Sequence, residues 1–337
     1  MSTIVKDPEG LVGTPARPSR ALAETMLRYP VLGPLAALCV AVVAFAVTTD
    51  TFFTVDNLSL VAQQSLVVAT LALGQTLIVL TAGIDLANAA IMVLGTLVCA
   101  RLAAQGVPIF IALLMGVAIC TVLGSISGGL VTGLKLPPFI VTLGMLTVIL
   151  AGGRLYSVGT SWPVTAPLLG VLGEGGYLFG QLKVTYGMML AAFMFAVMWF
   201  ALSQTAWGKH VYALGNDYES ARLTGIHVRR TMFSVYVVAG TIYGIAAWQA
   251  LGRIPNADPN AFQTGNLDSI TAVVIGGTSL FGGRGGVIGS LVGALIVTVL
   301  RSGLTQANID SLYQDVATGI LVIAAVAFDQ WARRRAL

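Results

Sequence analysis

The chain has 337 residues, of which 56% are apolar and only 9% are Asp, Glu, Lys or Arg. Ordinary globular chains carry about 25% charged residues, so a water-soluble domain of this length is excluded, and intrinsic disorder is excluded by the same composition. The mean hydropathy of +0.87 instead indicates a polytopic membrane protein. The apolar runs are continuous, whereas barrel strands alternate apolar and polar residues. We therefore expect an all-α fold whose spanning helices satisfy their own backbone groups.

Apolar runs predict about ten spans, divided into two groups of five by an outer loop at 157–183. The predicted spans are 31–49, 58–80, 86–104, 108–133, 137–156, 184–205, 231–252, 267–282, 286–305 and 313–331. A basic tail at 1–30 precedes this membrane domain (31–331), and a second basic tail follows at 332–337. The other long polar segment is 206–230.

The distribution of Lys and Arg predicts the side on which each loop lies. With both termini placed in the cytoplasm, 13 of the 18 basic residues fall inside and five fall outside. This excess favours cytoplasmic termini. The pI of about 9.1 then follows from topology and not from nucleic-acid binding, because no basic stripe is interleaved with exposed aromatic residues.

The sequence contains no recognisable catalytic or metal-binding motif. Both histidines fall in 206–230, and no HExxH, GxSxG or Cys/His cluster occurs. Gly208-Lys209 lacks the upstream glycines of a nucleotide-binding loop. The three cysteines lie in apolar runs without metal-ligand spacing, and we interpret them as small buried hydrophobic residues. We therefore expect a non-catalytic subunit with no metal site and no cofactor of its own.

Ionisable residues are scarce within the spans. Asp85 lies in a short break after the second span and Asp268 opens the eighth. Each carboxylate either caps a helix or serves a function. A carrier coupled to protons or sodium would show several carboxylates in mid-helix, so the sequence favours transport energised by another subunit.

Two interruptions by glycine predict where a solute path lies, because transporter sites tend to form where spans are short or broken. The first interruption is 82–85, and the second lies in the eighth span at Gly276-Gly277 and Gly282-Gly283. The polar residues nearest these breaks are the candidates for lining the path: Gln75, Asp85, Asn88 and Thr278. The alternative is that the glycines only permit close packing of helices.

A short amphipathic helix is predicted within 206–230, on the cytoplasmic side. We expect Asn216 to be its N-cap and Gly225 its stop. The residues that would form a docking element are Gly215, Asn216, Glu219, Ala221, Arg222, Leu223, Thr224 and Gly225. The alternative is a solvated connector. On the outer side, Arg154 and Arg253 end spans five and seven, where we expect them to pair with acidic patches of an external partner.

Four segments resemble the permease subunits of ABC importers of the ribose type. They are Gly-Ile-Asp-Leu at 83–86, Leu-Pro-Pro-Phe-Ile-Val-Thr-Leu-Gly at 136–144, the Gly-Asn pair and Ala-Arg-Leu-Thr-Gly-Ile run within 215–226, and Ala-Val-Val-Ile-Gly-Gly-Thr-Ser-Leu-Phe-Gly-Gly at 272–283. The chain departs from that family at 87–89, which is Ala-Asn-Ala, and at Gln75, where the family commonly has methionine.

The resemblance implies a multi-pass permease of the bacterial cytoplasmic (inner) membrane that imports a monosaccharide. It implies a homodimer with the path at the two-fold axis, a cytoplasmic ABC ATPase that uses ATP and Mg, and a periplasmic sugar-binding protein. The helix within 206–230 would couple ATPase closure to transport. Permeases for branched-chain amino acids or nucleosides share this plan and remain alternatives, as does a membrane scaffold that transports nothing.

Overall fold

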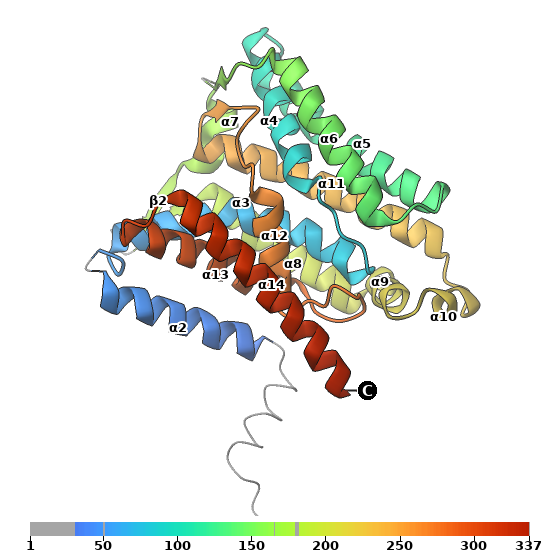
Figure 1. Cartoon of the computed structure of the whole chain (residues 1–337). Helices are drawn as coiled ribbons and strands as arrows, with labels where there is room; N and C mark the ends of the chain where they lie inside the picture. Colours follow the sequence, from blue (N-terminus) through green and yellow to red (C-terminus); the bar gives the residue numbers. More distant parts are fainter. Residues whose placement is uncertain (1–30, 50, 165, 179–181, 337) are drawn as a thin grey trace, which may run out of the picture.

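A computed structural model describes residues 31–49, 51–164, 166–178 and 182–336, which form an assembly of helices (Figure 1). The predicted tail at 1–30 lies outside the described residues. The helices that fall on predicted spans are α2 (Leu32–Thr48), α3 (Val55–Leu80), α4 (Asn88–Ala104), α5 (Ile109–Gly133), α6 (Pro138–Ser157), α8 (Tyr186–Gln204), α11 (Val228–Arg253), α12 (Gly265–Ile275), α13 (Val287–Gln306) and α14 (Ser311–Ala336). The all-α polytopic fold is confirmed.

Among the described residues, six of these helices are long and apolar enough to cross a membrane. They are α3, α5, α6, α8, α11 and α13, whereas α2, α4, α12 and the apolar part of α14 are shorter. The spanning helices differ in burial: 83% of the apolar window of α3 is buried within the chain, against 28% in α5 and 22% in α6. Helix α3 is therefore central, and it packs against α11, α12 and α13.

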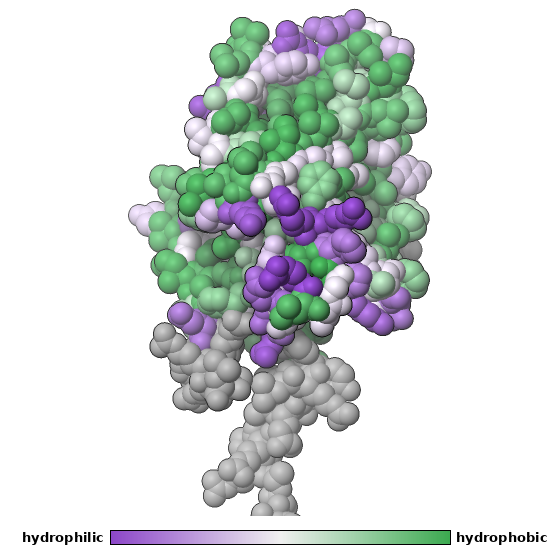
Figure 2. Space-filling model, turned by 90° about the vertical axis from the view of Figure 1, so that its right-hand side faces the viewer, coloured by the Kyte–Doolittle hydropathy of each residue, from purple (hydrophilic) through white to green (hydrophobic). Residues whose placement is uncertain are grey.

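Helices at the periphery of the assembly expose large apolar side chains, as expected of helices that face lipid. Phe110 on α5, Ile140 on α6 and Phe193 on α8 are 63%, 61% and 65% exposed. Figure 2 shows hydrophobic residues over most of one side of the molecule. Its hydrophilic residues gather near the upper edge and in a patch in the lower half, at the height of the α5–α6 turn and α10 in Figure 1.

The predicted outer loop at 157–183 contains regular structure. It holds the short helix α7 (Pro167–Gly170), a 3₁₀ turn (Val171–Gly173) and the antiparallel pair β2 (Gly175–Leu178) and β3 (Leu182–Thr185). Strand β1 (Trp162–Pro163) pairs with β4 (Asn256–Ala257), which follows α11. This pairing ties the segment after α6 to the segment after α11.

The predicted end of the eighth span is wrong. The eighth span, predicted as 267–282, is helical only over Gly265–Ile275. The chain then turns through Gly277, Gly282, Gly283 and Gly285, whose φ angles between +70° and +116° belong to a left-handed region that does not continue a helix. Residues 332–336, which the sequence assigns to the second basic tail, are helical and continue α14.

Candidate functional site

The predicted cytoplasmic docking segment contains two helices, α9 (Ala206–Asn216) and α10 (Tyr218–Leu223). The expectation that Asn216 is the N-cap is wrong, because Asn216 is the last residue of α9. The N-cap of α10 is Asp217, whose carboxylate accepts a hydrogen bond from the backbone N–H of Ser220 at 2.9 Å. This bond holds the pKa of Asp217 below its ordinary value, so the cap stays ionised at neutral pH and weakens as the pH falls through that lowered pKa.

The predicted stop of this helix at Gly225 is confirmed. Gly225 has φ +86°, and its N–H donates to the carbonyl of Arg222 at 3.1 Å. The N–H of Ile226 donates to the carbonyl of Ala221 at 3.2 Å. Together these two bonds form a Schellman motif, in which a left-handed residue closes the helix and satisfies its last carbonyl groups.

Helix α10 has one buried face and one open face. Ala221 is buried in a small apolar cluster with Leu214 and Val228, which fixes α10 to α9 and to the start of α11. In contrast, Leu223 is 80% exposed, and Glu219 pairs with Arg222 at 2.9 Å on the surface. Tyr218 is also exposed, so the open face offers two large hydrophobic side chains beside charged groups, a composition suited to a protein partner.

A groove lies between α10 and the α5–α6 turn. It encloses about 440 Å³ and is lined by both elements, including Tyr218 and Glu219 on α10 and Lys135 and Pro137 in the turn. The hydrophilic patch in the lower half of Figure 2 lies at the height of these elements. A partner bound to α10 would thus also contact the turn before α6.

The end of α9 meets two other segments at a point without room for a side chain. A Cβ placed on Gly215 would lie 1.7 Å from the carbonyl oxygen of Leu80 and 2.7 Å from the backbone nitrogen of Gly283. The N–H of Gly283 donates to that same Leu80 carbonyl at 3.0 Å. We call Leu80, Gly215 and Gly283 the inner junction. It joins the end of α3, the end of α9 and the loop 276–286 that follows α12.

The four segments that carry the family resemblance converge on this region. Gly215 and Gly283 belong to two of them. The segment 83–86 begins three residues after the end of α3, and the hydroxyl of Thr142, from the segment 136–144, donates to the carbonyl of Ile84 at 2.9 Å. A further bond runs from the hydroxyl of Tyr212 on α9 to the carbonyl of Gly285 at 2.9 Å. Segments far apart in the sequence are therefore linked by backbone contacts and by side-chain hydroxyls that donate to main-chain carbonyls.

The structure brings three of the four predicted path residues together. In the orientation that satisfies both atoms of its amide, Gln75 donates to the carbonyl of Asp85 at 3.0 Å and accepts from its N–H at 3.2 Å. The Asp85 carboxylate accepts from the N–H of Ala87 at 2.8 Å. Asn88 donates to the Ser269 hydroxyl at 2.7 Å, which links α4 to α12.

The fourth residue, Thr278, lies apart from these three. Its hydroxyl oxygen accepts from the N–H of Gly286 at 3.2 Å and closes the loop after α12. None of the four path candidates is more than 1% exposed. In this conformation they stabilise the two helix breaks.

The predicted outer residues lie on either side of one loop. Arg154 is exposed at the end of α6, and Arg253 is half-buried at the end of α11. Arg154 lines a cavity of about 240 Å³ and Arg253 lines one of about 470 Å³. Asn260, Phe262 and Gln263 line both cavities. The loop 254–264 thus separates the two arginines.

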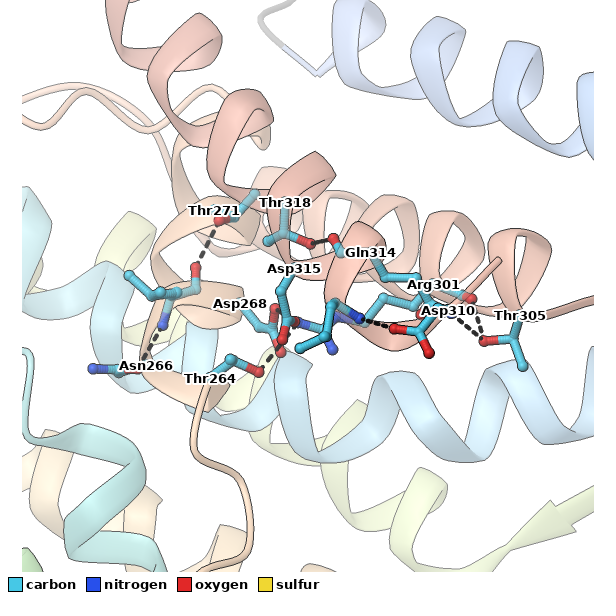
Figure 3. Close-up of polar contacts among 12 residues, drawn as sticks. Thr264, Asn266, Asp268, Thr271, Arg301, Thr305, Asp310, Gln314, Asp315 and Thr318 are labelled. Carbon is cyan, nitrogen blue, oxygen red and sulfur yellow. Dashed lines mark hydrogen bonds and ion pairs between the residues drawn. The ribbon is translucent and has the colours of Figure 1, made fainter. Parts of the chain in front are cut away.

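Sequence reasoning missed the ion network around Arg301. The guanidinium bonds Asp268 on α12 at 2.8 Å, Asp315 on α14 at 3.1 Å and the Thr264 hydroxyl at 3.1 Å. Figure 3 shows these side chains converging from three elements. Arg301 is one of the five basic residues that the distribution of Lys and Arg places on the outer side, and no further role was predicted for it. Its position inside a predicted span, with acidic residues on two neighbouring spans, was the available signal.

Comparison with known proteins identifies the family. A model of the permease component of branched-chain amino acid transport systems matches residues 57–326. The chain belongs to this family. It is 40% identical over 312 residues to the fructose import permease protein FrcC of Rhizobium meliloti, covering 90% of this chain and 86% of that protein. The resemblance drawn from the four segments is confirmed.

Two other relatives have similar coverage. The chain is 34% identical over 302 residues to the ribose import permease protein RbsC of Bacillus subtilis, covering 89% of this chain and 92% of that protein. It is 31% identical over 295 residues to the galactose/methyl galactoside import permease protein MglC of Haemophilus influenzae, covering 83% and 88%. No solved structure matches the chain.

Proposed function

We propose that this permease is the membrane subunit of an ATP-driven importer of monosaccharides. The observation that carries the proposal is similarity along most of the chain to import permeases named for fructose, ribose and galactose. The geometry supports it, since a short helix with an exposed face, two broken spans and a polar cavity occur in one chain. The permease itself catalyses no reaction, and a partner ATPase hydrolyses ATP with Mg.

The proposed arrangement in the membrane follows the charge distribution. About ten helices cross the bacterial inner membrane with both termini in the cytoplasm. The ATPase binds the exposed face of α10, and the periplasmic sugar-binding protein docks near Arg154 and Arg253. A second copy of the permease completes the path, and both are held by the lipid bilayer.

The inner junction supplies the coupling. ATPase closure moves α10, and the buried face of α10 carries α9 with it. Because Gly215 contacts Leu80 and Gly283 with no intervening side chain, displacement of α9 must shift the end of α3 and the loop 276–286. These are the elements that carry Gln75 and Thr278. Movement there would expose the path candidates, including Asp85 and Asn88, which are buried in this conformation.

Uptake by the reconstituted complex tests this proposal. The permease, its ATPase and its binding protein are placed in liposomes with internal ATP and Mg. Uptake of radiolabelled ribose, fructose, galactose, leucine and adenosine is then measured. We expect ATP-dependent uptake of at least one of the three sugars and of neither other solute. Uptake of leucine or adenosine alone would assign the permease to the alternative substrate classes, and no uptake would support a scaffold.

A further inference from the structure

A cavity of about 470 Å³ opens among α3, α12, α13, α14 and the loop 254–264. Its residues occupy the same end of the molecule as Arg253, at the end of α11. Gln64 lies in the first half of α3, Arg301 in the last two turns of α13, and Asp315 in the first two turns of α14. In the proposed topology this is the outer half of the protein. The volume is within the range of about 300–1,000 Å³ that holds small ligands.

The charges that line this cavity balance. Arg301 and Arg253 face Asp268 and Asp315, and the Arg301 guanidinium bonds both carboxylates. The side chain of Asp268 is 9% exposed and that of Arg301 is 29% exposed. A ligand with net charge would compete with these ion pairs and leave one charged group without its partner. The cavity therefore favours a neutral ligand.

The remaining lining groups are amides and an aromatic ring. Gln64, Asn260 and Gln263 each bring both a donor and acceptors, and Phe262 contributes a flat apolar surface. The hydroxyl groups of Thr264, Thr298 and Ser311 add further groups that can donate or accept. A compact ligand with many hydroxyl groups matches amides that can both donate and accept.

The cavity lies on the same face of α3 as Gln75, one of the buried polar residues near the helix breaks. Gln64, Val68, Leu71 and Gln75 are three or four residues apart, so they share one face of α3, and the first three line the cavity. Leu71 is fully buried and marks the inner end on this helix. Gln75 lies about 6 Å further along the axis. Next to it, Asn88 bonds Ser269, which directly follows the cavity residue Asp268.

We propose that this cavity is an outer binding site for a neutral monosaccharide, closed on its inner side by Leu71 and followed by the cluster of Gln75 and Asn88. The inference rests on the proposed function and adds a location and a chemical basis to it. Sugar received from outside occupies the cavity while the inner junction is closed. Gln64 is its most direct test residue, because it is a half-buried amide on a spanning helix and takes no part in the ion network.

The first experiment compares two replacements of an amide by an apolar side chain. Gln64→Leu removes a cavity amide, and Gln105→Leu removes an exposed amide at the end of α4, outside the cavity. Uptake uses whichever of ribose, fructose and galactose the wild type imports fastest. We expect Gln64→Leu to lower uptake kcat/KM about five- to tenfold, equivalent to loss of about one hydrogen bond, and Gln105→Leu to match the wild type. Equal uptake by all three proteins overturns the inference.

The second experiment measures binding without transport. Cys39 is exposed whereas Cys99 and Cys120 are buried, so Cys39→Ala supplies a background of low reactivity for Gln64→Cys. We expect a small hydrophilic maleimide to label this cysteine, and the same sugar at high concentration to slow labelling at least twofold while an equal concentration of leucine does not. Labelling unaffected by sugar overturns the site. A wild type that imports no sugar instead overturns the proposed function, so the two failures are distinguishable.

Discussion

The inner junction and the outer cavity are built in opposite ways. At the inner junction, main chains touch directly, and a Cβ on Gly215 would lie 1.7 Å from a carbonyl oxygen. At the outer cavity, long polar side chains surround about 470 Å³ of space. A contact between backbones has no side-chain rotamers to absorb displacement, whereas a cavity lined with amides can adapt to a ligand. In the proposed topology, the inner end is thus suited to transmitting movement and the outer end to binding.

Gly215→Ala should have the largest effect, because its methyl group has no space at the inner junction. We expect a loss of about 3 kcal/mol in stability, the upper end of the usual range for an overpacked site, together with loss of sugar uptake. Thermal unfolding of the purified permease and uptake by the reconstituted complex measure the two effects. Gly144→Ala is the matched control, since a Cβ there meets nothing within 4 Å. If Gly215→Ala has the stability and the uptake of the wild type, the inner junction has room for a methyl group and is not tightly packed.

At the outer end, Asp268→Asn should have the next largest effect. Asp268 is 9% exposed and bonds Arg301, whereas Asp315, the other partner of Arg301, is 43% exposed. Neutralising Asp268 should cost about 2 kcal/mol, as for a buried hydrogen bond between charged groups. Asp315→Asn should cost less than about 1 kcal/mol because solvent screens that pair. Unfolding midpoints in the same detergent compare the two variants, and the reverse order would contradict the burial assigned to them.

Gly225→Val tests the link between α10 and the inner junction. A Cβ at Gly225 meets nothing within 4 Å, but its φ of +86° is strained for a β-branched residue. Distortion of the α10 stop should lower uptake about tenfold, equivalent to 1.4 kcal/mol, while ATP hydrolysis by the complex continues. Gly225→Asn is the control, because Asn tolerates the left-handed region. Equal uptake by Gly225→Val and the wild type would show that α10 does not couple.

The two regions also differ in how far the sequence predicts them. Apolar runs located the spanning helices, because burial in lipid requires continuous stretches of apolar residues. The glycines of 276–286 correctly indicated a break, but not that Gly283 meets Leu80 and Gly215. That contact depends on how three segments pack. The sequence predicted Asn216 as the N-cap, whereas the structure has Asp217. Both residue types cap helices well, so the sequence does not distinguish them, and the backbone conformation determines which one is the cap.

The outer cavity was less predictable still. Gln64 is one of several polar residues on predicted spans, and nothing in the sequence distinguishes it from Gln63. The network of Arg301 joins residues from three helices, and its geometry depends on the register between those helices. The position of Arg301 inside a predicted span indicated that its charge needs a partner. Counting basic residues predicts the side of the membrane on which each lies, but it does not identify that partner.

The smallest expected effect is that of charge reversal at the outer face, and it separates two roles of Arg253. This residue ends α11 near the proposed docking surface, and it also lines the outer cavity. If docking dominates, Arg253→Glu should raise the binding-protein concentration for half-maximal ATPase stimulation about threefold, because charged contacts chiefly change association rates. Added salt should abolish that difference, since exposed charges are screened within about 10 Å at 0.1 M. Arg154→Glu, at an exposed residue on the other side of the loop 254–264, should behave in the same way.

A defect of Arg253→Glu that persists in high salt, while that of Arg154→Glu disappears, would instead place Arg253 in the cavity, where its charge balances Asp268 and Asp315. An unchanged titration for both variants would exclude this face from docking.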